Sequence, residues 1–317
     1  MNLTDKRGHN MMNKLNSIKK YGFVATSFLL LLFVAIAIKA SQNAKVFADE
    51  PSSIRLATFN IRSNFGSDTQ DWQTRLVSLD SLLRSYDFDI IGSQEPYQRQ
   101  IDDLMKLYGN VYDYFVVNTR NSSEKPTIHS NPIFYKKDRF KLLKSGTFWY
   151  SETPDVAGSV SWEASQARNC NWVELYDKEN KTSFFVFNSH FDHKSTLARN
   201  HSAKILIEKV QAIADKKLAI CTGDFNTIQT TKAFATLSDS GVLIDAHAVA
   251  KKVVNDNYKT NHGYKVMPPV SSATRIDHIF ISKNSFPKRV DLWKCCIENF
   301  GGHWASDHYP IYIEFTL

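Results

Sequence analysis

The chain has 317 residues, of which 43% are hydrophobic, 13% aromatic and 22% charged. This composition excludes a disordered or fibrous protein and allows one large domain or two small ones. The formal net charge is +7, but residues 1–48 carry +6 of it. Their charged side chains are Lys6, Arg7, Lys14, Lys19, Lys20, Lys39, Lys45 and Asp5. Residues 49–317 are therefore almost neutral, which gives no support for non-specific binding of polyanions.

An apolar run without a charge occupies residues 21–38 and follows Lys14, Lys19 and Lys20. A helix of this length rises about 27 Å, close to the thickness of a bilayer core. Two interpretations fit, a signal peptide cleaved after residues 46–48 (VFA) and an uncleaved signal anchor. Positive charge before the run marks the cytoplasmic end. Both interpretations place residues 49–317 outside the cytoplasm, secreted or anchored through the N-terminal helix.

The four cysteines, Cys170, Cys221, Cys295 and Cys296, are too few for a disulfide scaffold. We expect Cys170 and Cys221 to be small buried apolar residues. The adjacent Cys295 and Cys296 could bridge each other only with strain.

The predicted elements begin after a polar linker at residues 49–53. Apolar spacing predicts helices at 75–86, from Pro96 to about 108, at 196–214 and at 230–237. Strand-like runs occupy 54–61, 88–92, 112–117, 132–136, 140–149, 171–176, 183–188, 218–222, 242–246, 275–282, 289–293 and 310–315. No internal repeat or linker divides the chain after residue 54. We therefore predict one α/β domain over 54–317, a β-sandwich with helices on its outer faces.

Several of these strands end in a carboxylate, an amide or an imidazole. The candidates are Asn60, Glu95, His190, Asp192, His193, Asp224, Asn226, Asp277, Asp307 and His308. Catalytic groups often lie where a strand passes into a loop, although Asp-x-Asn is also a common turn and a lone His is usually a satisfied polar residue. Together the set suits a hard divalent cation and the attack of water on a phosphate.

The motifs L-A-T-F-N-I-R, I-I-G-S-Q-E, F-N-S-H-F-D-H, G-D-F-N, R-I-D-H-I-F and S-D-H-Y-P occur in this order. The chain resembles the endonuclease/exonuclease/phosphatase (DNase I-like) superfamily over roughly residues 55–315. The blocks at 146–155 (GTFWYSETPD) and 168–172 (RNCNW) resemble an exported bacterial branch of it. The resemblance implies a four-layer α/β/β/α sandwich.

The resemblance also implies a metal site. Glu95 would be the main ligand of Mg²⁺ or Mn²⁺, with Asn60 beside it, and Asp307 would complete or support the site. Glu95 could equally be a helix N-terminal acid favoured by the dipole, since Pro96 follows it.

The remaining motif residues would act on the substrate. Asp224 would orient or deprotonate the attacking water, and Asn226 would contact the phosphate or the water. His308 would bind the phosphate, with Asp277 holding its tautomer and raising its pKa. His190 would stabilise the transition state or protonate the leaving oxygen.

Three further residues have two interpretations each. Arg168 is either a phosphate clamp or a structural salt bridge. Asp192 and His193 either contact the substrate or form a loop network that holds His190. We expect His278, on the opposite face of its strand from Asp277, to have no part in the site.

These features predict an exported, divalent-metal-dependent, nuclease-like phosphodiesterase. Alternative substrates are phospholipid or sphingomyelin and inositol or sugar phosphates, and an inactive binding protein of the same fold is a further alternative. We expect a monomer whose partners are a phosphate ester, such as nucleic acid or a lipid head group, and the membrane if the leader is uncleaved.

Overall fold

The computed structural model describes residues 51–66, 68–121, 128–285, 287 and 289–317, together with Val34, Ala35 and Lys39. The apolar run at 21–38 therefore lies outside the described residues except at Val34 and Ala35. None of the helices in the described part of the chain is long and apolar enough to cross a bilayer. Contacts divide the chain into Met1–Pro51 and Ser52–Leu317, and the fold below is that of the second unit.

Seven strands form the first sheet, in the order β10-β12-β13-β1-β2-β4-β3. They are β1 (Ser53–Asn60), β2 (Ile90–Gln94), β3 (Tyr112–Phe115), β4 (Ile133–Lys136), β10 (Lys252–Val254), β12 (Arg289–Cys295) and β13 (Ile311–Thr316). The central strand β1 pairs parallel with β2 and antiparallel with β13.

Six strands form the second sheet, in the order β5-β6-β7-β8-β11-β9. They are β5 (Phe140–Trp149), β6 (Asn169–Asp177), β7 (Thr182–His190), β8 (Ala219–Asp224), β9 (Leu243–Asp245) and β11 (Asp277–Ser282). Because β7 and β8 are parallel, their polar C-terminal residues end side by side. The antiparallel β11 begins there, with Asp277 opposite Asp224.

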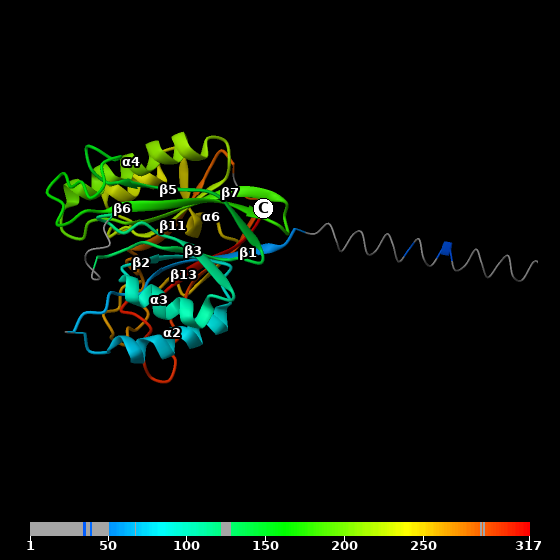
Figure 1. Cartoon of the computed structure of the whole chain (residues 1–317), viewed down its shortest axis with the longest axis horizontal. Coiled ribbons are helices and arrows are strands. Elements are labelled where there is room, and N and C mark those ends of the chain that lie inside the picture. The colour runs from blue at the N-terminus through cyan, green and yellow to red at the C-terminus, as the bar shows by residue number, and fades with distance from the viewer. Residues whose placement is uncertain are drawn as a thin grey trace, which may run out of the picture. The chain divides into compact units, whose positions relative to one another are not determined.

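Helices cover the outer faces of the two sheets (Figure 1). The helices are α2 (Trp72–Tyr86), α3 (Gln98–Tyr108), α4 (Thr196–Ala214), α5 (Lys232–Ser238) and the single turn α6 (Ala246–Val249). α2 and α3 pack on the first sheet, and α4 and α5 pack on the second. This confirms the predicted four-layer α/β/β/α sandwich.

The alternation of side chains along the strands explains the layers. In β1, Ile54 and Leu56 belong to the core between the sheets, whereas Ala57 and Phe59 belong to the core under α2 and α3. Both strand faces are buried, so these strands read as continuous apolar runs. The cysteines are free and buried, with Cys170 and Cys221 in the core beside α4, as predicted.

Helix boundaries differ from the predictions where side-chain caps decide them. α2 starts at Trp72 because the Asp71 carboxylate accepts a hydrogen bond from the Thr74 amide at 2.8 Å. The predicted strand at 242–246 ends early, since Asp245 caps α6. Elements as short as α6 and β10 have no periodicity that a sequence could reveal.

Candidate active site

The face between the two sheets changes from apolar to polar toward one end of the strands. In β1, Ile54 and Leu56 are followed on the same face by Thr58 and Asn60. The same change along one face occurs in β7, with Phe184, Val186, Asn188 and then His190, and in β8, with Ile220, Thr222 and then Asp224. A polar layer therefore lies between the apolar core and the ionisable residues.

Hydrogen bonds connect the residues of this polar layer, which are Thr58, Gln94, Asn188 and Thr222, while Gln94 Oε1 has no partner among the described residues. Gln94 Nε2 donates to Asn188 Oδ1 at 2.7 Å and to Thr58 Oγ1 at 3.1 Å, and Thr222 Oγ1 donates to Asn188 Oδ1 at 3.1 Å. Buried polar groups paired in this way join the two sheets in one register. The layer is thus a fixed floor for the side chains above it.

Glu95 follows β2 with a φ of +74°, a left-handed conformation that non-glycine residues rarely adopt. Asn60 Nδ2 donates to Glu95 Oε1 at 3.0 Å, and the Ser63 amide donates to Oε2 at 3.1 Å. Burial opposes ionisation, but these hydrogen bonds and His129 lower the pKa of Glu95. The chain therefore holds Glu95 as a carboxylate.

Asp224 lies at the centre of the ionisable residues. Its Oδ2 accepts from Asn60 Nδ2 at 3.0 Å and lies 3.4 Å from His190 Nε2. Its Oδ1 accepts a hydrogen bond from the backbone N–H of Asn226 at 3.0 Å. Burial and the Asp277 carboxylate raise the pKa of Asp224 to about 7. A carboxylate of this pKa can take a proton near neutral pH.

His308 and Asp277 form a buried pair. His308 Nδ1 lies 2.9 Å from Asp277 Oδ2, and His308 Nε2 lies 3.9 Å from Asp224 Oδ2. Burial acts against the charged ring, but the charge and hydrogen bond of Asp277 outweigh it and raise the pKa of His308 to about 10. Asp277 therefore fixes the orientation of the ring through Nδ1, and Nε2 faces Asp224 and the Asn261 side chain.

A cavity of about 260 Å³, here called the polar cavity, is bounded by these residues. Its lining residues are Arg62, Phe65, Glu95, His129, Gln166, Arg168, His190, His193, Asp224, Asn226, Asn261, Ile276, Asp307 and His308. Among the sequence candidates, Asn60 and Asp277 lie behind this lining and reach it through their hydrogen bonds.

Arg168 supplies a buried cation to the polar cavity. Only 3% of the residue is exposed, and its Nε and Nη1 have no hydrogen-bond partner among the described residues. Its Nη2 lies 3.0 Å from His193 Nδ1. Burial and Arg168 lower the pKa of His190 well below its usual value, so His190 is neutral at pH 7. Unpaired guanidinium nitrogens in a cavity are suited to binding an anion.

Asp192 does not line the polar cavity. Its carboxylate accepts hydrogen bonds from the amides of Ser165, Lys194 and Ser195 and from Ser165 Oγ, at 2.6–2.9 Å. It also lies 3.8 Å from Arg168 Nε. The contacts favour a loop network over substrate contact, but this network holds Arg168 and not His190, which was the residue expected from the sequence.

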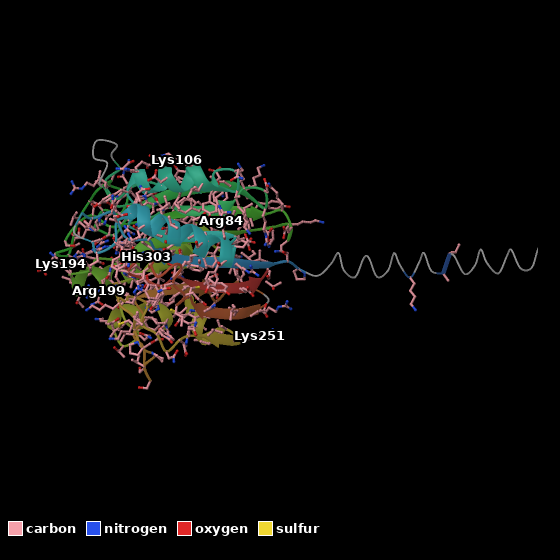
Figure 2. The ribbon with its side chains drawn as sticks, turned by 90° about the horizontal axis from the view of Figure 1, so that it is seen from below. Arg84, Lys106, Lys194, Arg199, Lys251 and His303 are labelled. Carbon is pink, nitrogen blue, oxygen red and sulfur yellow. The ribbon has the colours of Figure 1, made fainter. Side chains whose placement is uncertain are left out.

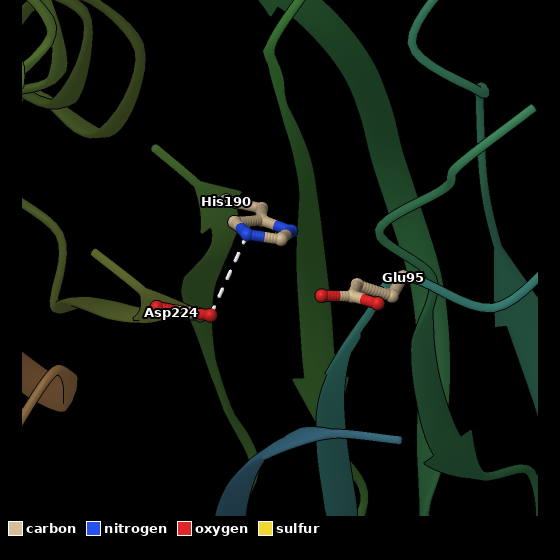
Figure 3. A group of neighbouring side chains, drawn as sticks. All are labelled: Glu95, His190 and Asp224. Atoms are coloured by element: carbon tan, nitrogen blue, oxygen red, sulfur yellow. Dashed lines mark ion pairs between the residues drawn. The ribbon is translucent and has the colours of Figure 1, made fainter. Parts of the chain in front are cut away.

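The donor set fits a divalent cation. One donor atom from each of Glu95, His190 and Asp224 lies within 4.8 Å of the others, and Figure 3 shows these side chains facing one another from neighbouring strand ends. A second group consists of Asp224, Asp277 and His308. Carboxylate oxygens are the ligands that such cations prefer. Asp307 lies outside both groups, with Oδ2 3.7 Å from Arg62 Nη1.

Asn60 presents its amide nitrogen to Glu95 and Asp224, while its Oδ1 accepts from the Arg62 amide at 3.0 Å. In this orientation it bridges two carboxylates. As a metal ligand it would have to turn its oxygen toward them.

Sequence reasoning missed several lining residues. His129, Gln166 and Asn261 lie in loops, outside any motif, and only the folded chain brings them to the polar cavity. Asn261 Nδ2 lies 2.8 Å from His308 Nε2. His278 packs against Phe225 and Phe280, and its Nε2 lies 2.9 Å from the Thr227 carbonyl oxygen, so it is structural.

Known proteins share this sequence pattern and fold. The model of the Endonuclease/Exonuclease/phosphatase family matches residues 57–308. A family member from Bacteroides thetaiotaomicron is 30% identical, with a TM-score of 0.76 over 84% of this chain and 98% of that chain. The mannosyl-6-phosphatase Bt3783 of Bacteroides thetaiotaomicron VPI-5482 is also 30% identical, with a TM-score of 0.75 over 83% of this chain and 100% of that chain.

A more distant structure shares the fold alone. It is the TDP2 of D. rerio complexed with single strand DNA product, 20% identical, with a TM-score of 0.63 over 84% of this chain and 100% of that chain. No curated protein matches the chain. The chain belongs to the Endonuclease/Exonuclease/phosphatase family and is a hydrolase that acts on phosphoric ester bonds.

Proposed function

We propose that this hydrolase cleaves a phosphate ester by metal-assisted attack of water in the polar cavity. The observation that carries the proposal is the convergence of Glu95, His190 and Asp224, within 4.8 Å of one another, beside the buried guanidinium of Arg168, whose Nε and Nη1 make no hydrogen bond to a described residue. Phosphate hydrolysis needs carboxylates that bind a metal ion and positively charged side chains that bind the phosphate.

The roles follow from the contacts. Asp224, whose pKa is raised to about 7, accepts the proton of the attacking water. His308, held by Asp277, donates a hydrogen bond to the phosphate, and Arg168 binds another of its oxygens. The water oxygen bonds to phosphorus as the bond to the leaving oxygen breaks, and the leaving oxygen takes a proton from solvent water. Neutral His190 lies beside Asp224, where it can orient the attacking water.

Glu95 would hold the metal, Mg²⁺ or Mn²⁺, and Asp224 lies beside it as the base, with Asn60 and Asp307 next to them. When bound, the metal supplies positive charge against the charge that develops on the phosphate. The two carboxylates are already ordered by hydrogen bonds from Asn60 and Ser63, which reduces the cost of forming the site.

A compact phosphate ester, such as a sugar phosphate, is the first substrate candidate. Its support is the volume of the polar cavity, about 260 Å³, the near-neutral charge of residues 49–317 and the printed name of the 30% identical mannosyl-6-phosphatase. The nuclease-like phosphodiesterase predicted from the sequence is the second candidate. Its support is Lys194 and Arg199, cations just after His193 at one end of the molecule (Figure 2).

A substrate panel tests the proposal. The full chain, purified in detergent, is assayed with hexose 6-phosphate, glycerol 3-phosphate, single-stranded DNA, RNA, sphingomyelin and bis-p-nitrophenyl phosphate, each with Mg²⁺ or Mn²⁺. We expect turnover of at least one ester, and a loss of about 10³-fold or more in Asp224→Asn. The surface variant Asp256→Asn is the matched control. Turnover in Asp224→Asn close to that of the wild type would contradict the role of Asp224.

We propose export on the apolar run at 21–38 and the three lysines before it. A fusion of residues 1–50 to a reporter enzyme that is active only outside the cytoplasm tests this. We expect reporter activity, which should disappear when two leucines of the run become arginine. An inactive, cytoplasmic fusion would rule export out.

A further inference from the structure

One wall of the polar cavity is aromatic. This wall, here called the aromatic wall, consists of Phe65 and His129, which line the cavity, and of Tyr97, which packs against both. The ring of Phe65 meets Tyr97 edge to face at 6.1 Å and His129 at 6.0 Å, and the rings of Tyr97 and His129 lie 5.6 Å apart. Phe65 follows β1, Tyr97 follows β2 and His129 precedes β4. Segments next to strands of the first sheet therefore supply the whole wall.

Arg62 fixes the position of Phe65. Its guanidinium donates to both carboxylate oxygens of Asp68, at 3.0 and 3.3 Å, and lies 4.7 Å from the centre of the Phe65 ring. Such a paired guanidinium over an aromatic face restricts the motion of both groups. The aromatic wall is therefore ordered before any ligand binds.

The aromatic wall stands out because the rest of the lining is polar. Phe65 and Ile276 are the apolar residues of the lining, among charged, amide and imidazole side chains. A phosphate group gains nothing from a phenyl ring, whereas the apolar face of a sugar or a nucleobase does. The aromatic wall thus suits a part of the substrate other than the phosphate.

The direction of the reaction places the leaving group near the aromatic wall. Asp224, which activates the water, belongs to the second sheet, and the wall belongs to the first. In-line displacement puts the leaving oxygen opposite the attacking water. Phe65 and His129 line the polar cavity together with Glu95, so a group that departs on the side of Glu95 meets the wall.

His129 adds a polar contact to this surface. Its Nδ1 is buried and has no hydrogen-bond partner in the part of the chain that the structure describes. A buried nitrogen without a partner is costly unless a ligand pairs with it. A hydroxyl or ring nitrogen of the leaving group can supply that partner.

We propose that the aromatic wall is the leaving-group subsite, and that it selects esters whose leaving group carries a ring that stacks on Phe65. This inference rests on the proposed phosphoesterase function. Sugars and nucleosides share the required ring face, and the test below has an arm for each.

The test is the specificity of Phe65→Leu in the full chain. We compare kcat/KM for hexose 6-phosphate, a nucleoside 5′-monophosphate and the acyclic glycerol 3-phosphate, with Mn²⁺ present. We expect Phe65→Leu to lose about fivefold more for the ring-bearing esters than for glycerol 3-phosphate, because only they stack. Phe65→Tyr, which keeps the ring, should preserve the wild-type ratio. The matched control is Phe115→Leu, since Phe115 is a half-buried phenylalanine of β3 outside the lining.

The assays with hexose 6-phosphate and with the nucleotide show which kind of ring stacks on Phe65. A larger loss for hexose 6-phosphate assigns the subsite to a sugar, and a larger loss for the nucleotide assigns it to a base. Equal losses for all three esters, or an unchanged ratio, would overturn the proposal.

Binding separates this proposal from the proposed function. Calorimetry in the Asp224→Asn background gives Kd for the same three ligands, with and without Phe65→Leu. If the wild-type chain hydrolyses no ester, the proposed function fails, but a selective loss of affinity for the ring-bearing ligands still supports the subsite. Equal affinities with and without the phenyl ring would refute the subsite alone.

Discussion

The Asp192 carboxylate affects the polar cavity through the residues that it contacts. Hydrogen bonds from Ser165, Lys194 and Ser195 outweigh burial and lower the pKa of Asp192 to about 2. The same loop carries His193, whose Nδ1 lies 3.0 Å from Arg168 Nη2. A network of this kind positions the buried guanidinium without touching the substrate.

Asp192→Asn should therefore lower stability in a pH-dependent way. Because the pKa of Asp192 is lower in the folded chain, its ionised carboxylate stabilises the fold at pH values above about 3.9, its pKa in the unfolded chain. This stabilisation is lost as the pH falls toward 2. We expect the free energy of unfolding to fall by about 2 kcal/mol at pH 7, with a smaller difference at pH 3. Urea unfolding at both pH values measures it. Asp155→Asn, at an exposed carboxylate, is the control, and an equal effect of the two variants would refute this role.

Asp277 offers a second test at the scale of one residue. Asp277→Asn removes the charge that raises the pKa of His308, so that pKa should fall. We expect kcat/KM to drop about 10²- to 10⁴-fold, as when other catalytic histidines lose their carboxylate. NMR titration of His308 and kinetics check both effects. An unchanged His308 pKa would show that Asp277 does not act through this ring.

At the scale of elements, the site depends on how closely the two sheets approach. Gly92 of β2 faces Thr222 of β8, and a Cβ atom on Gly92 would lie 2.1 Å from Thr222 Oγ1 and 2.8 Å from Asn188 Oδ1. A glycine is required there because the polar layer leaves no room for a methyl group.

Gly92→Ala should force the sheets apart. We expect the free energy of unfolding to fall by about 1–3 kcal/mol, the usual effect of overpacking, and activity to fall with it because Glu95 follows the same strand. Urea unfolding and kcat/KM are the measurements. Gly66→Ala, at a glycine with no atom within 4 Å of the added carbon, is the control and should leave stability nearly unchanged.

For the whole molecule, the metal links stability to activity. EDTA should abolish turnover, and Mn²⁺ or Mg²⁺ should restore it, if the carboxylate of Glu95 holds the ion. Metal at 100 times its Kd should stabilise the folded chain by about 2.7 kcal/mol.

Thermal unfolding and calorimetry, with Glu95→Gln as the variant that lacks the site, measure the metal effect. Turnover that survives EDTA would contradict the metal mechanism. Metal binding without turnover on any ester would instead favour the inactive binding protein considered from the sequence.

Some long elements were predictable from the sequence. The predicted helix at 196–214 coincides with α4, and the predicted strand at 140–149 coincides with β5. Each extends over enough residues for a helical or a strand-like pattern of apolar residues to be recognised. β10 and α6 were missed because three or four residues carry no such pattern.

The motifs also indicated most of the residues that line the polar cavity, because catalytic side chains follow strands and strands can be seen in the sequence. They did not indicate His129 or Asn261, which lie in loops and reach the cavity only through tertiary packing. Nor did they show that Asp192 faces away from it.

The sequence by itself determined the alternation of strands and helices, the polar strand ends and the family, since these depend on local pattern. Tertiary structure decided which of these side chains meet. Asn60 and Asp224 belong to different sheets, yet hydrogen-bond at 3.0 Å. Only the stacking of the two sheets, with the ends of β1, β2, β7 and β8 at one edge, creates that contact, because its partners lie far apart along the chain.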